Sequence, residues 1–399
     1  MSHTMSPVQS ASLDPYHPAA LLDPYPYYAE LRAQGPVVFV PERAIWLVPG
    51  YAEAEAVLRN HTEFVSGDGV TYRGRDHRER FPLLESDPPE HNRIRRSVQP
   101  SFAKGALEAL RPGIVAAAVS IADRAVVSGD IDAIQVIADP MPHRAMALLT
   151  GIIPPSCQTY VDWGDAVVRA EEPAADPQYA AMLGEALEWL SRDGLNDLPP
   201  HCLGRLITDS GGARGGLAAD GLERLMTLAS IWLAGIESTA ALLGNAINAF
   251  IEHPDQWELL RRQPELIPNA VEELLRYEAP FRIFYRRTRA QAQVGGVSIP
   301  AGAPVGVLLA SAGRDPRQFP DPDRLDLRRD NARRHLSFST AVHQCLGAPL
   351  ARMEATAMLT ELTGRVVRFE RAGEAVRHPS GTVRKFESLP VRLVPGRGA

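Results

Sequence analysis

Residues 219–252 constrain the fold of this 399-residue chain more than any other segment. They are predicted to form one continuous helix of roughly 30 residues, about 45 Å long at the helical rise per residue. Apolar side chains surround its middle on nearly all sides, which is typical of a helix buried in a core or a membrane. Glu237 lies at its centre, with Ser230, Ser238 and Thr239 nearby. These polar residues favour a helix buried inside a protein over a membrane span.

The rest of the sequence predicts a mainly α protein with small β-sheets, a single large domain over residues 1–399. Residues 1–14 are expected to form a flexible tail, and the glycine-rich residues 210–216 a surface loop. A β-hairpin is expected at 37–49, and further β-structure at 294–311. A charged helix is expected after the proline pair at 88–89. Other helices are predicted at 104–128, 140–152, 155–170, 176–192, 267–277 and from 347 onward.

Composition excludes several classes of protein. With 45% hydrophobic residues, 23% charged residues and a net charge of −6, the chain has apolar material for a core and little self-repulsion, so it is not a disordered protein. The arginines are scattered and form no basic stripe, which argues against nucleic acid as a partner. The first 25 residues contain no apolar region of signal-peptide length, so we expect a cytoplasmic protein.

The three cysteines are too few for a disulfide framework or a four-cysteine metal site. We interpret Cys157 and Cys202 as small buried hydrophobic residues. Cys345 differs because it lies just ahead of a helix predicted to begin near Pro349. The free N–H groups and the positive end of that helix favour a thiolate over a thiol. A cysteine in this position is suited to bind a metal.

Four motifs carry a resemblance to a known family. They are His91 with Arg95, the run Ala234-Gly235-Ile236-Glu237-Ser238-Thr239, Glu273 with Arg276, and Phe338 followed by His343, Cys345, Gly347 and Ala351-Arg352. In this order and spacing they resemble the motifs of the cytochromes P450, and the resemblance extends from about Pro15 to Val394. It implies an enzyme, a soluble bacterial haem-thiolate monooxygenase that activates dioxygen on haem b, with Cys345 as the iron ligand.

The resemblance also implies roles for other residues. The residues expected to contact the haem or its propionates, besides Cys345, are His91, Arg95, Ala234, Arg286, Phe338, His343 and Gly347. Glu237 and Ser238, with Thr239, are expected to deliver protons to bound dioxygen. Glu273 and Arg276 are expected to form a structural ion-pair network with Arg324.

The sequence departs from the family pattern at two points. The alcohol of the oxygen-activation motif is usually threonine, and the alignment places Ser238 there. The haem loop usually has glycine where this chain has Ser339 and Ala341, so the loop must accommodate a Cβ atom at both positions.

For the substrate, two stretches, 286–316 and 377–393, resemble the branch of the family that oxidises para-substituted benzoates and aryl ethers, by hydroxylation or O-demethylation. Asp68 aligns where that branch has a polar or basic residue, and would repel a benzoate carboxylate. Arg73 and Arg282 are therefore expected to supply the compensating cation. Ser230 and Phe284 are also expected to line the pocket. A neutral or cationic aromatic, a terpenoid, a macrolide or another secondary metabolite remains the alternative.

The chain contains no nucleotide-binding fingerprint and no cysteine set for an iron–sulfur cluster. The resemblance therefore implies electrons from NAD(P)H through a separate reductase and a ferredoxin, of the [2Fe-2S] type or similar. This partner is expected to dock around Arg352 and the pair Arg333-Arg334. The rival class is a haem-thiolate protein that uses no external electrons, such as a peroxide-driven enzyme, an isomerase or a ligand-binding protein.

Overall fold

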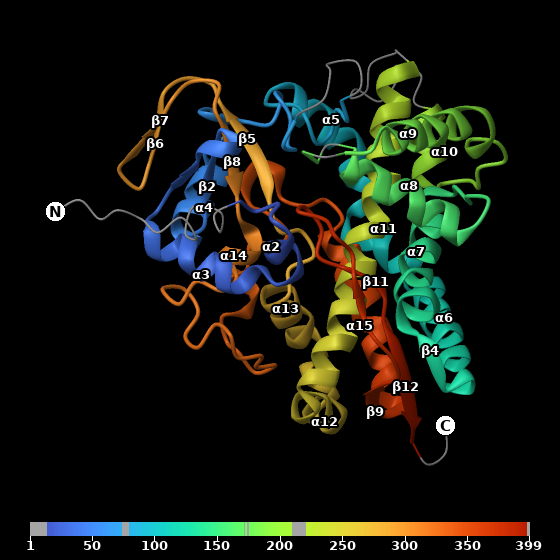
Figure 1. Ribbon diagram of the computed structural model, residues 1–399. Helices are drawn as coiled ribbons and strands as arrows, with labels where there is room; N and C mark the ends of the chain where they lie inside the picture. The colour runs from blue at the N-terminus through green and yellow to red at the C-terminus, as the bar shows by residue number, and fades with distance from the viewer. Residues whose placement is uncertain (1–13, 74–79, 171, 174, 210–220, 397–399) are drawn as a thin grey trace.

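The computed structural model describes residues 14–396, apart from 74–79, 171, 174 and 210–220 (Figure 1). The expected tail therefore lies outside the described residues up to residue 13. Asp14 forms an ion pair of 2.7 Å with Arg43. The expected glycine-rich loop at 210–216 also lies outside the described residues.

Helices form most of the chain. They are α2 (Pro18–Leu22), α3 (Pro24–Gln34), α4 (Tyr51–Arg59), α5 (Glu90–Val98), α6 (Lys104–Ser128), α7 (Pro140–Thr150), α8 (Cys157–Arg169), α9 (Pro177–Trp189), α10 (Leu203–Asp209), α11 (Gly221–Glu252), α12 (Pro254–Arg262), α13 (Ile267–Tyr277), α14 (Leu309–Ala312) and α15 (Ala348–Arg365). Helices α6 to α11 and α15 gather on one side of the molecule in Figure 1. The predicted helices are confirmed within a few residues.

The strands are short. They are β1 (Val38–Val40), β2 (Ile45–Val48), β3 (Phe64–Val65), β4 (Asp130–Asp132), β5 (Phe284–Thr288), β6 (Ala292–Val294), β7 (Val297–Ile299), β8 (Pro304–Val307), β9 (Val366–Arg371), β10 (Val376–Arg377), β11 (Phe386–Ser388) and β12 (Pro390–Pro395). The largest sheet has the order β1-β2-β8-β5-β3 and lies on the other side of the molecule in Figure 1, with α2, α3 and α4. A mainly α fold with small sheets is confirmed.

The expected hairpin at 37–49 is the pair β1 and β2, which are antiparallel with Val38 opposite Leu47. Strand β2 also pairs in parallel with β8, and β8 pairs antiparallel with β5. Buried aliphatic side chains such as Val48 and Val305 cover one face of this sheet. The sheet thereby fixes the position of β5, whose first residue, Phe284, lines the interior cavity described below.

Helix α11 runs through the core and contacts α7, α8, α13 and α15. By length and apolar composition α6 and α11 would both pass as membrane spans, but 78% of the most apolar window of α11 is buried inside the protein. The share for α6 is 33%, and this helix packs along α7 and α15. The prediction of a core helix is confirmed. Ala234 is an exception on α11, because it is exposed in mid-helix where the helix borders the cavity.

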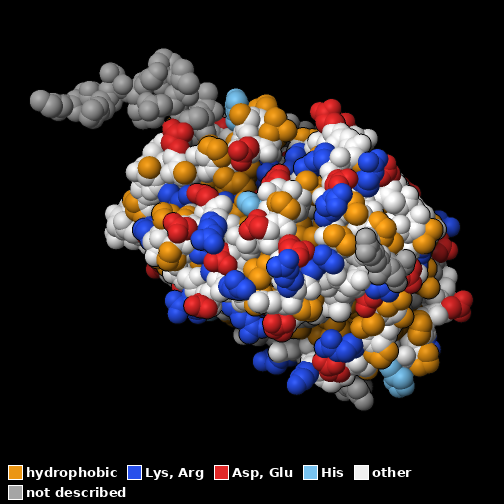
Figure 2. Space-filling view, turned by 90° about the horizontal axis from the view of Figure 1, so that it is seen from below, with side chains coloured by type: hydrophobic (Ala, Val, Ile, Leu, Met, Phe, Trp, Pro, Cys, Tyr) orange, Lys and Arg blue, Asp and Glu red, His pale blue; other side chains and the backbone are white. Residues whose placement is uncertain are grey.

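Surface charge is mixed. On the face that Figure 2 shows, basic and acidic side chains intersperse without a continuous field of one sign. This agrees with the scattered arginines of the sequence.

A buried ion pair fixes α13 against the loop that follows α14. The guanidinium of Arg276 donates two hydrogen bonds to the carboxylate of Glu273, at 2.6 and 2.7 Å, and both side chains are fully buried. Arg276 also donates to the carbonyl oxygens of Gly313, Pro322 and Arg324. The pair therefore holds together segments about 40 residues apart.

The third member of this network is not the one predicted from the sequence. Arg329 donates its Nε–H to Glu273 Oε1 at 3.1 Å, with a side chain that is 8% exposed. Arg324, the predicted partner, contributes only its backbone carbonyl, and the residue is exposed. The difference arises because this loop turns through Asp321 at a positive φ of 46°, so its register cannot be read from the spacing of its arginines.

We expect Arg329→Ala to destabilise the protein by about 1–3 kcal/mol, because it removes a charged hydrogen bond from a buried carboxylate. Arg276→Ala leaves Glu273 without its main partner and should cost about 3–5 kcal/mol. Arg324→Ala is the matched control and should change stability by less than about 0.5 kcal/mol. The free energy of unfolding in urea measures all three. Equal losses of unfolding free energy in Arg324→Ala and Arg329→Ala would contradict the assignment of Arg329 as the side-chain partner of Glu273.

Candidate active site

A cavity lies between the middle of α11 and the loop that precedes α15. Its volume is about 290 Å³. Its wall includes five residues of the α11 motif, which are Ala234, Gly235, Glu237, Ser238 and Thr239. The opposite wall includes Phe338, His343, Cys345 and Gly347. Residues separated by about 100 positions in the sequence thus face each other across one cavity.

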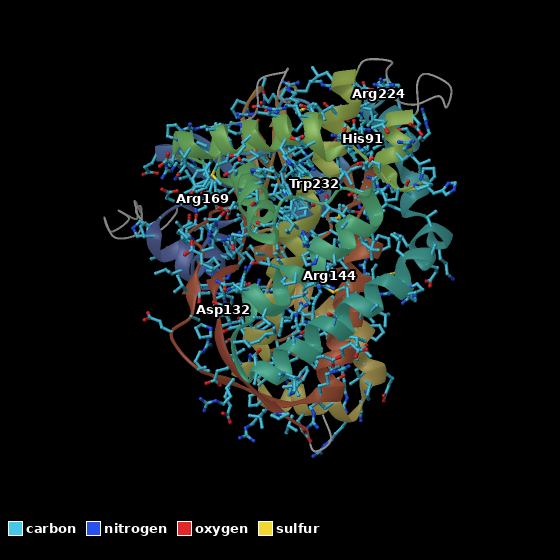
Figure 3. The ribbon with its side chains drawn as sticks, turned by 90° about the vertical axis from the view of Figure 1, so that its right-hand side faces the viewer. His91, Asp132, Arg144, Arg169, Arg224 and Trp232 are labelled. Atoms are coloured by element: carbon cyan, nitrogen blue, oxygen red, sulfur yellow. The ribbon has the colours of Figure 1, made fainter. Side chains whose placement is uncertain are left out.

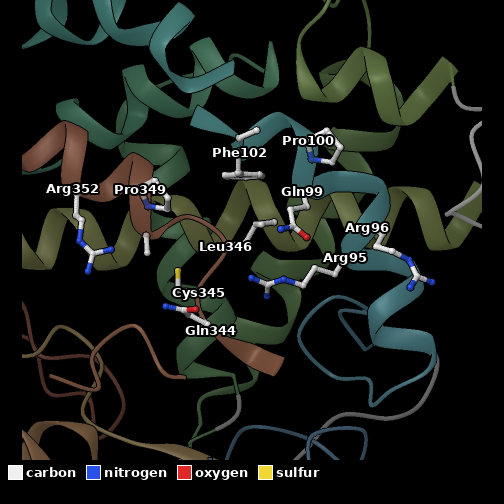
Figure 4. A pocket seen from close by; sticks show the side chains of 12 residues that line it. Arg95, Arg96, Gln99, Pro100, Phe102, Gln344, Cys345, Leu346, Pro349 and Arg352 are labelled. Carbon is white, nitrogen blue, oxygen red and sulfur yellow. The ribbon is translucent and has the colours of Figure 1, made fainter. Parts of the chain in front are cut away.

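Cys345 lies between two hollows, the interior cavity and a surface pocket (Figure 4). Its backbone N–H donates to the carbonyl oxygen of Phe338 at 2.8 Å, which fixes the loop. Cys345 is exposed to the hollows beside it, but the protein atoms around its sulfur desolvate the thiol and raise its pKa, while hydrogen bonds from the backbone N–H groups of Gly347 and Ala348 lower it. Such donors stabilise a thiolate once a metal ion binds it. Cys202 is buried as expected, whereas Cys157 is half-buried.

The loop before Cys345 has a left-handed backbone at two residues. Ser339 and Ala341 both have φ values of +55°, a conformation that favours glycine. These are the two positions where the sequence departs from the glycines of the family. The loop therefore retains the left-handed conformation at both positions, and the two Cβ atoms make this backbone strained.

Four basic side chains gather at one edge of the cavity. The rings of His91 and His343 lie 4.3 Å apart between centroids, and Arg95 donates to the carbonyl oxygen of Val342 at 3.4 Å. Burial lowers the pKa of Arg286 to about 10, and burial together with the charge of Arg286 lowers that of His343 to about 2. Neither Arg95 nor Arg286 forms an ion pair within the part of the chain that the structure describes.

These four residues are the ones predicted to meet the haem propionates. His343 Nε2 is buried and, among the described residues, has no hydrogen-bond partner. A buried polar atom without a partner is costly unless a ligand satisfies it. An apolar slot with unpaired cations at one edge and a cysteine on its floor fits haem, a large apolar plate with two carboxylates.

Glu237 is held by a residue that the sequence did not single out. Its Oε2 accepts a hydrogen bond from the ammonium of Lys385 at 2.8 Å, and Lys385 lies 3.2 Å from Asp165. Asp165 lies 2.8 Å from His378, which in turn contacts the half-exposed Glu387 at 3.0 Å. A continuous polar network thus leads from the cavity toward the surface.

The charges in this network depend on one another. Burial raises the pKa of Glu237, and the ammonium of Lys385 opposes that shift. Burial would also raise the pKa of Asp165, but His378 and Lys385 hold it at about 2. The sequence offered one indication that Lys385 has a special role, because it is one of only two lysines in the chain.

The predicted substrate residues divide into two groups. Ser230 and Phe284 line the cavity, and the Ser230 hydroxyl donates to the carbonyl oxygen of Thr227 at 2.7 Å. Arg73, Arg282 and Asp68 do not line it. The exposed Arg73 donates to the carbonyl oxygen of Pro173, and Asp68 is also exposed.

Arg282 is a correction to the sequence-based prediction. Its guanidinium is buried and donates to the hydroxyl of Tyr28 at 3.2 Å and to the carbonyl oxygen of Ser380 at 2.8 Å. It therefore fixes the N-terminal segment to the C-terminal segment. Its neighbours Phe281 and Phe284 line the cavity instead, and all three directions are possible because residues 282 and 283 lie outside the regular strand that begins at Phe284.

The surface pocket on the other side of Cys345 is basic (Figure 4). Arg95, Arg96 and Arg352 line it, together with the apolar side chains of Phe102 and Leu346. Arg352 also donates two hydrogen bonds to Glu272, at 2.6 and 2.9 Å, so part of its charge is compensated.

Comparison with known proteins agrees with this geometry. The family model for cytochrome P450 matches residues 222–365. The cytochrome P450 monooxygenase PikC of Streptomyces venezuelae is 36% identical over 398 residues, covering 94% of this chain and 92% of that protein. This chain belongs to the cytochrome P450 family. The beta-dihydromenaquinone-9 omega-hydroxylase of Mycobacterium tuberculosis is 34% identical, covering 98% of this chain and 81% of the relative.

Solved P450 structures have the same fold. The structure of epothilone D-bound cytochrome P450epoK superimposes with a TM-score of 0.86 at 26% identity, covering 96% of this chain and 99% of the other. The chain is thus a P450 oxidoreductase, and its family implies a haem cofactor.

We expect Ala341→Gly to stabilise this P450 by up to about 1 kcal/mol. A left-handed non-glycine residue costs about 1–2 kcal/mol, and the greater freedom of glycine in the unfolded chain offsets part of the gain. Ala341 is exposed, so no packing is lost. The exposed Ala116 of α6 is the control, since Ala116→Gly should destabilise by about 1 kcal/mol. The urea midpoint of each variant is compared with that of the wild type. Shifts of the same sign in both variants would show that the backbone at Ala341 is not strained.

Proposed function

We propose that this P450 hydroxylates or O-demethylates a neutral, largely apolar small molecule, using dioxygen and electrons from a separate ferredoxin. The observation that carries the proposal is the composition of the cavity wall away from the cysteine loop. Its apolar members include Val70, Phe81, Leu83, Leu84, Val167, Val168, Ile231, Leu233, Phe281 and Phe284. The arginines in the described wall, Arg95 and Arg286, both lie at the edge assigned to the propionates.

Haem b is the cofactor that these residues would hold. Cys345 would bind the iron, and His91, Arg95, Arg286 and His343 would contact the propionates. Phe338 and Gly347 on one wall and Ala234 on the other would flank the ring. Haem bound through a thiolate supplies dioxygen activation, because the thiolate donates electron density that favours O–O cleavage.

Glu237 and Ser238 are proposed to move protons into the cavity, with Thr239 beside them. Burial raises the pKa of Glu237, so its carboxyl group takes up a proton more readily than an exposed one. Lys385 holds Glu237 Oε2 in one place, and Ser238 is only partly buried on the cavity wall. The serine hydroxyl lacks the β-methyl group of threonine and rotates more freely. Looser control of protons is the expected result.

A neutral substrate is supported over a benzoate. The two cations expected to hold a carboxylate, Arg73 and Arg282, are bonded elsewhere and do not line the cavity. In the described part of the wall, outside the edge assigned to the propionates, the charged side chains are those of Glu85, Glu237 and Glu354, all acids. A carboxylate beside them would lose its hydration and meet no cation among these wall residues. The similar proteins differ in ligand, since a relative is named for a menaquinone, one similar structure holds an epothilone and another holds an aryl phosphate.

A ferredoxin is proposed to dock over the surface pocket next to Cys345. Arg95, Arg96 and Arg352 give this pocket a positive charge that complements an acidic electron carrier. Arg333, 75% exposed and 3.5 Å from Glu272, extends the basic area. A reductase that oxidises NAD(P)H would complete the chain, in the cytoplasm where Cys345 stays reduced.

The substrate class is tested by optical titration of the ferric protein with para-methoxybenzoate and with its methyl ester. The ester is expected to shift the haem spectrum toward high spin, because the apolar wall accepts it without an unpaired charge. The acid is expected to produce no shift at the same concentrations. A shift with the acid and none with the ester would restore the benzoate hypothesis.

The reaction class is tested by comparing turnover with ferredoxin, reductase and NAD(P)H against turnover with hydrogen peroxide alone. Glu237→Gln removes the titratable proton but keeps the size of the side chain. We expect about 10²-fold slower ferredoxin-driven turnover, the size typical of a lost acid–base group, and unchanged peroxide-driven turnover. Cys345→Ala is expected to lose the haem colour. Faster turnover by peroxide than by any ferredoxin system would favour the rival class.

A further inference from the structure

Three of the five tryptophans of the chain form one aromatic cluster with Tyr160, outside the cavity. Trp232 of α11 lies between two rings that are nearly parallel to its own. Tyr160 of α8 is 4.7 Å away at 20°, and Trp189 at the end of α9 is 5.7 Å away at 23°. Trp163 of α8 lies 5.3 Å from Trp189 and 5.9 Å from Trp232. The four rings therefore form a continuous contact path.

The path begins behind the cavity wall and ends at the surface. Trp232 is fully buried and does not itself line the cavity, whereas its two neighbours in sequence, Ile231 and Leu233, do. Figure 3 shows Trp232 in the interior of the helical side. Trp189 is partly exposed to solvent. Indole rings in contact thus connect the wall beside the oxygen-activation motif with the outside of the protein.

The surroundings of Trp232 are suited to an electron that passes through rather than to a stable radical. Its indole N–H is buried and has no hydrogen-bond partner among the described residues. An oxidised indole in this position has no base to take its proton, so it remains a radical cation. Aromatic faces on both sides stabilise such a cation through their quadrupoles.

Tyr160 is a poor end point for the same charge. Its hydroxyl donates to the backbone carbonyl oxygen of Trp232, which is a weak base. Burial raises the pKa of Tyr160 well above its ordinary value, so the phenol stays protonated. Trp189 is the member of the cluster that reaches water, where an indole radical cation can release its proton.

We infer that Trp232 and Trp189, with Trp163 beside them, conduct single electrons from the surface to the haem site when an oxidising equivalent there meets no substrate. The inference rests on the proposed function, because the oxidising equivalent arises from dioxygen or peroxide at the haem. The path would limit oxidation of the haem and the cavity wall when substrate is absent.

Reduction of hydrogen peroxide to two water molecules at the haem site consumes two electrons and two protons. Trp232 supplies the two electrons one after the other, solvent supplies the protons, and Trp189 replaces each electron in turn. Trp189 then loses its N–H proton to water and becomes a neutral radical. A low-molecular-mass thiol in solution returns a hydrogen atom to it, and two thiyl radicals couple to a disulfide.

The test uses haem-loaded protein without substrate, mixed with hydrogen peroxide and frozen within milliseconds for electron paramagnetic resonance. The wild type is expected to give a tryptophan radical, and Trp189→Phe to lose most of it. The same variant is expected to bleach its haem several-fold faster. Trp257→Phe is the matched control, since Trp257 is a buried tryptophan that packs on Phe250 and Phe369 outside the cluster.

A second measurement uses only the wild-type protein, so its result does not depend on whether a variant folds. Peptide mapping of peroxide-treated wild type is expected to find oxidised Trp189 in preference to Trp46, which is similarly half-buried but outside the cluster. Equal oxidation at both sites would indicate peroxide in solution as the oxidant and overturn the inference.

Equal radical yield and bleaching in Trp189→Phe and Trp257→Phe would also overturn it, and the cluster would then be core packing alone. These outcomes are distinguishable from failure of the proposed function. A protein that binds no haem contradicts both proposals. A protein that binds haem and turns over with ferredoxin, but fails the tryptophan test, contradicts only the electron path.

Discussion

The structure depends on burying α11 on nearly all sides while leaving part of one face uncovered. Its apolar residues remove a helix of 32 residues from water against α7, α8, α13 and α15. Ala234, Gly235 and Ser238 break that coverage, and the space beside them is the cavity. Gly235 permits close packing from another side, since a Cβ atom there would lie 2.3 Å from the sulfur of Met146. Core packing and the active site are therefore properties of the same helix.

A buried helix that carries an acid needs a compensating cation. Glu237 obtains one from Lys385, which is 148 residues away in sequence and lies just before β11. Gly164 of α8 allows the approach, because a Cβ atom there would lie 2.7 Å from Ile236 and 3.2 Å from Glu237. The position of Glu237, which is proposed to carry protons, and the packing of α8 on α11 thus constrain each other.

Much of the fold could be predicted because its signals are local. Helix α13 begins and ends at the predicted residues, and the hairpin of β1 and β2 lies within the predicted range. Both rest on periodicity and turn residues that act over a few positions. The cavity residues Cys345 and Ser238 were also predicted because family motifs fix their spacing, and Phe284 because it lies in an extended run expected to approach the haem. The structure brings them to one cavity as expected.

The errors concern contacts between distant segments. Arg329 replaces Arg324 beside Glu273, and Arg282 holds the N-terminal segment instead of a substrate. Both errors depend on the direction that a side chain takes in an irregular segment. The sequence around an arginine does not tell whether its side chain is buried as a structural anchor or binds a ligand. Lys385 was missed for the same reason, although its rarity marked it.

The positions of Arg73 and Arg282 change the chemistry expected of the cavity. Every arginine that the sequence offered as a carboxylate partner is bonded to backbone or to another element, while the acids Glu85 and Glu237 remain in the wall. The described cations of the wall, Arg95 and Arg286, lie instead at the edge where His343 has a buried nitrogen without a partner among the described residues. The neutral substrate proposed above would be held by shape and apolar contact, which tolerates changes of substrate size more readily than a fixed carboxylate site does.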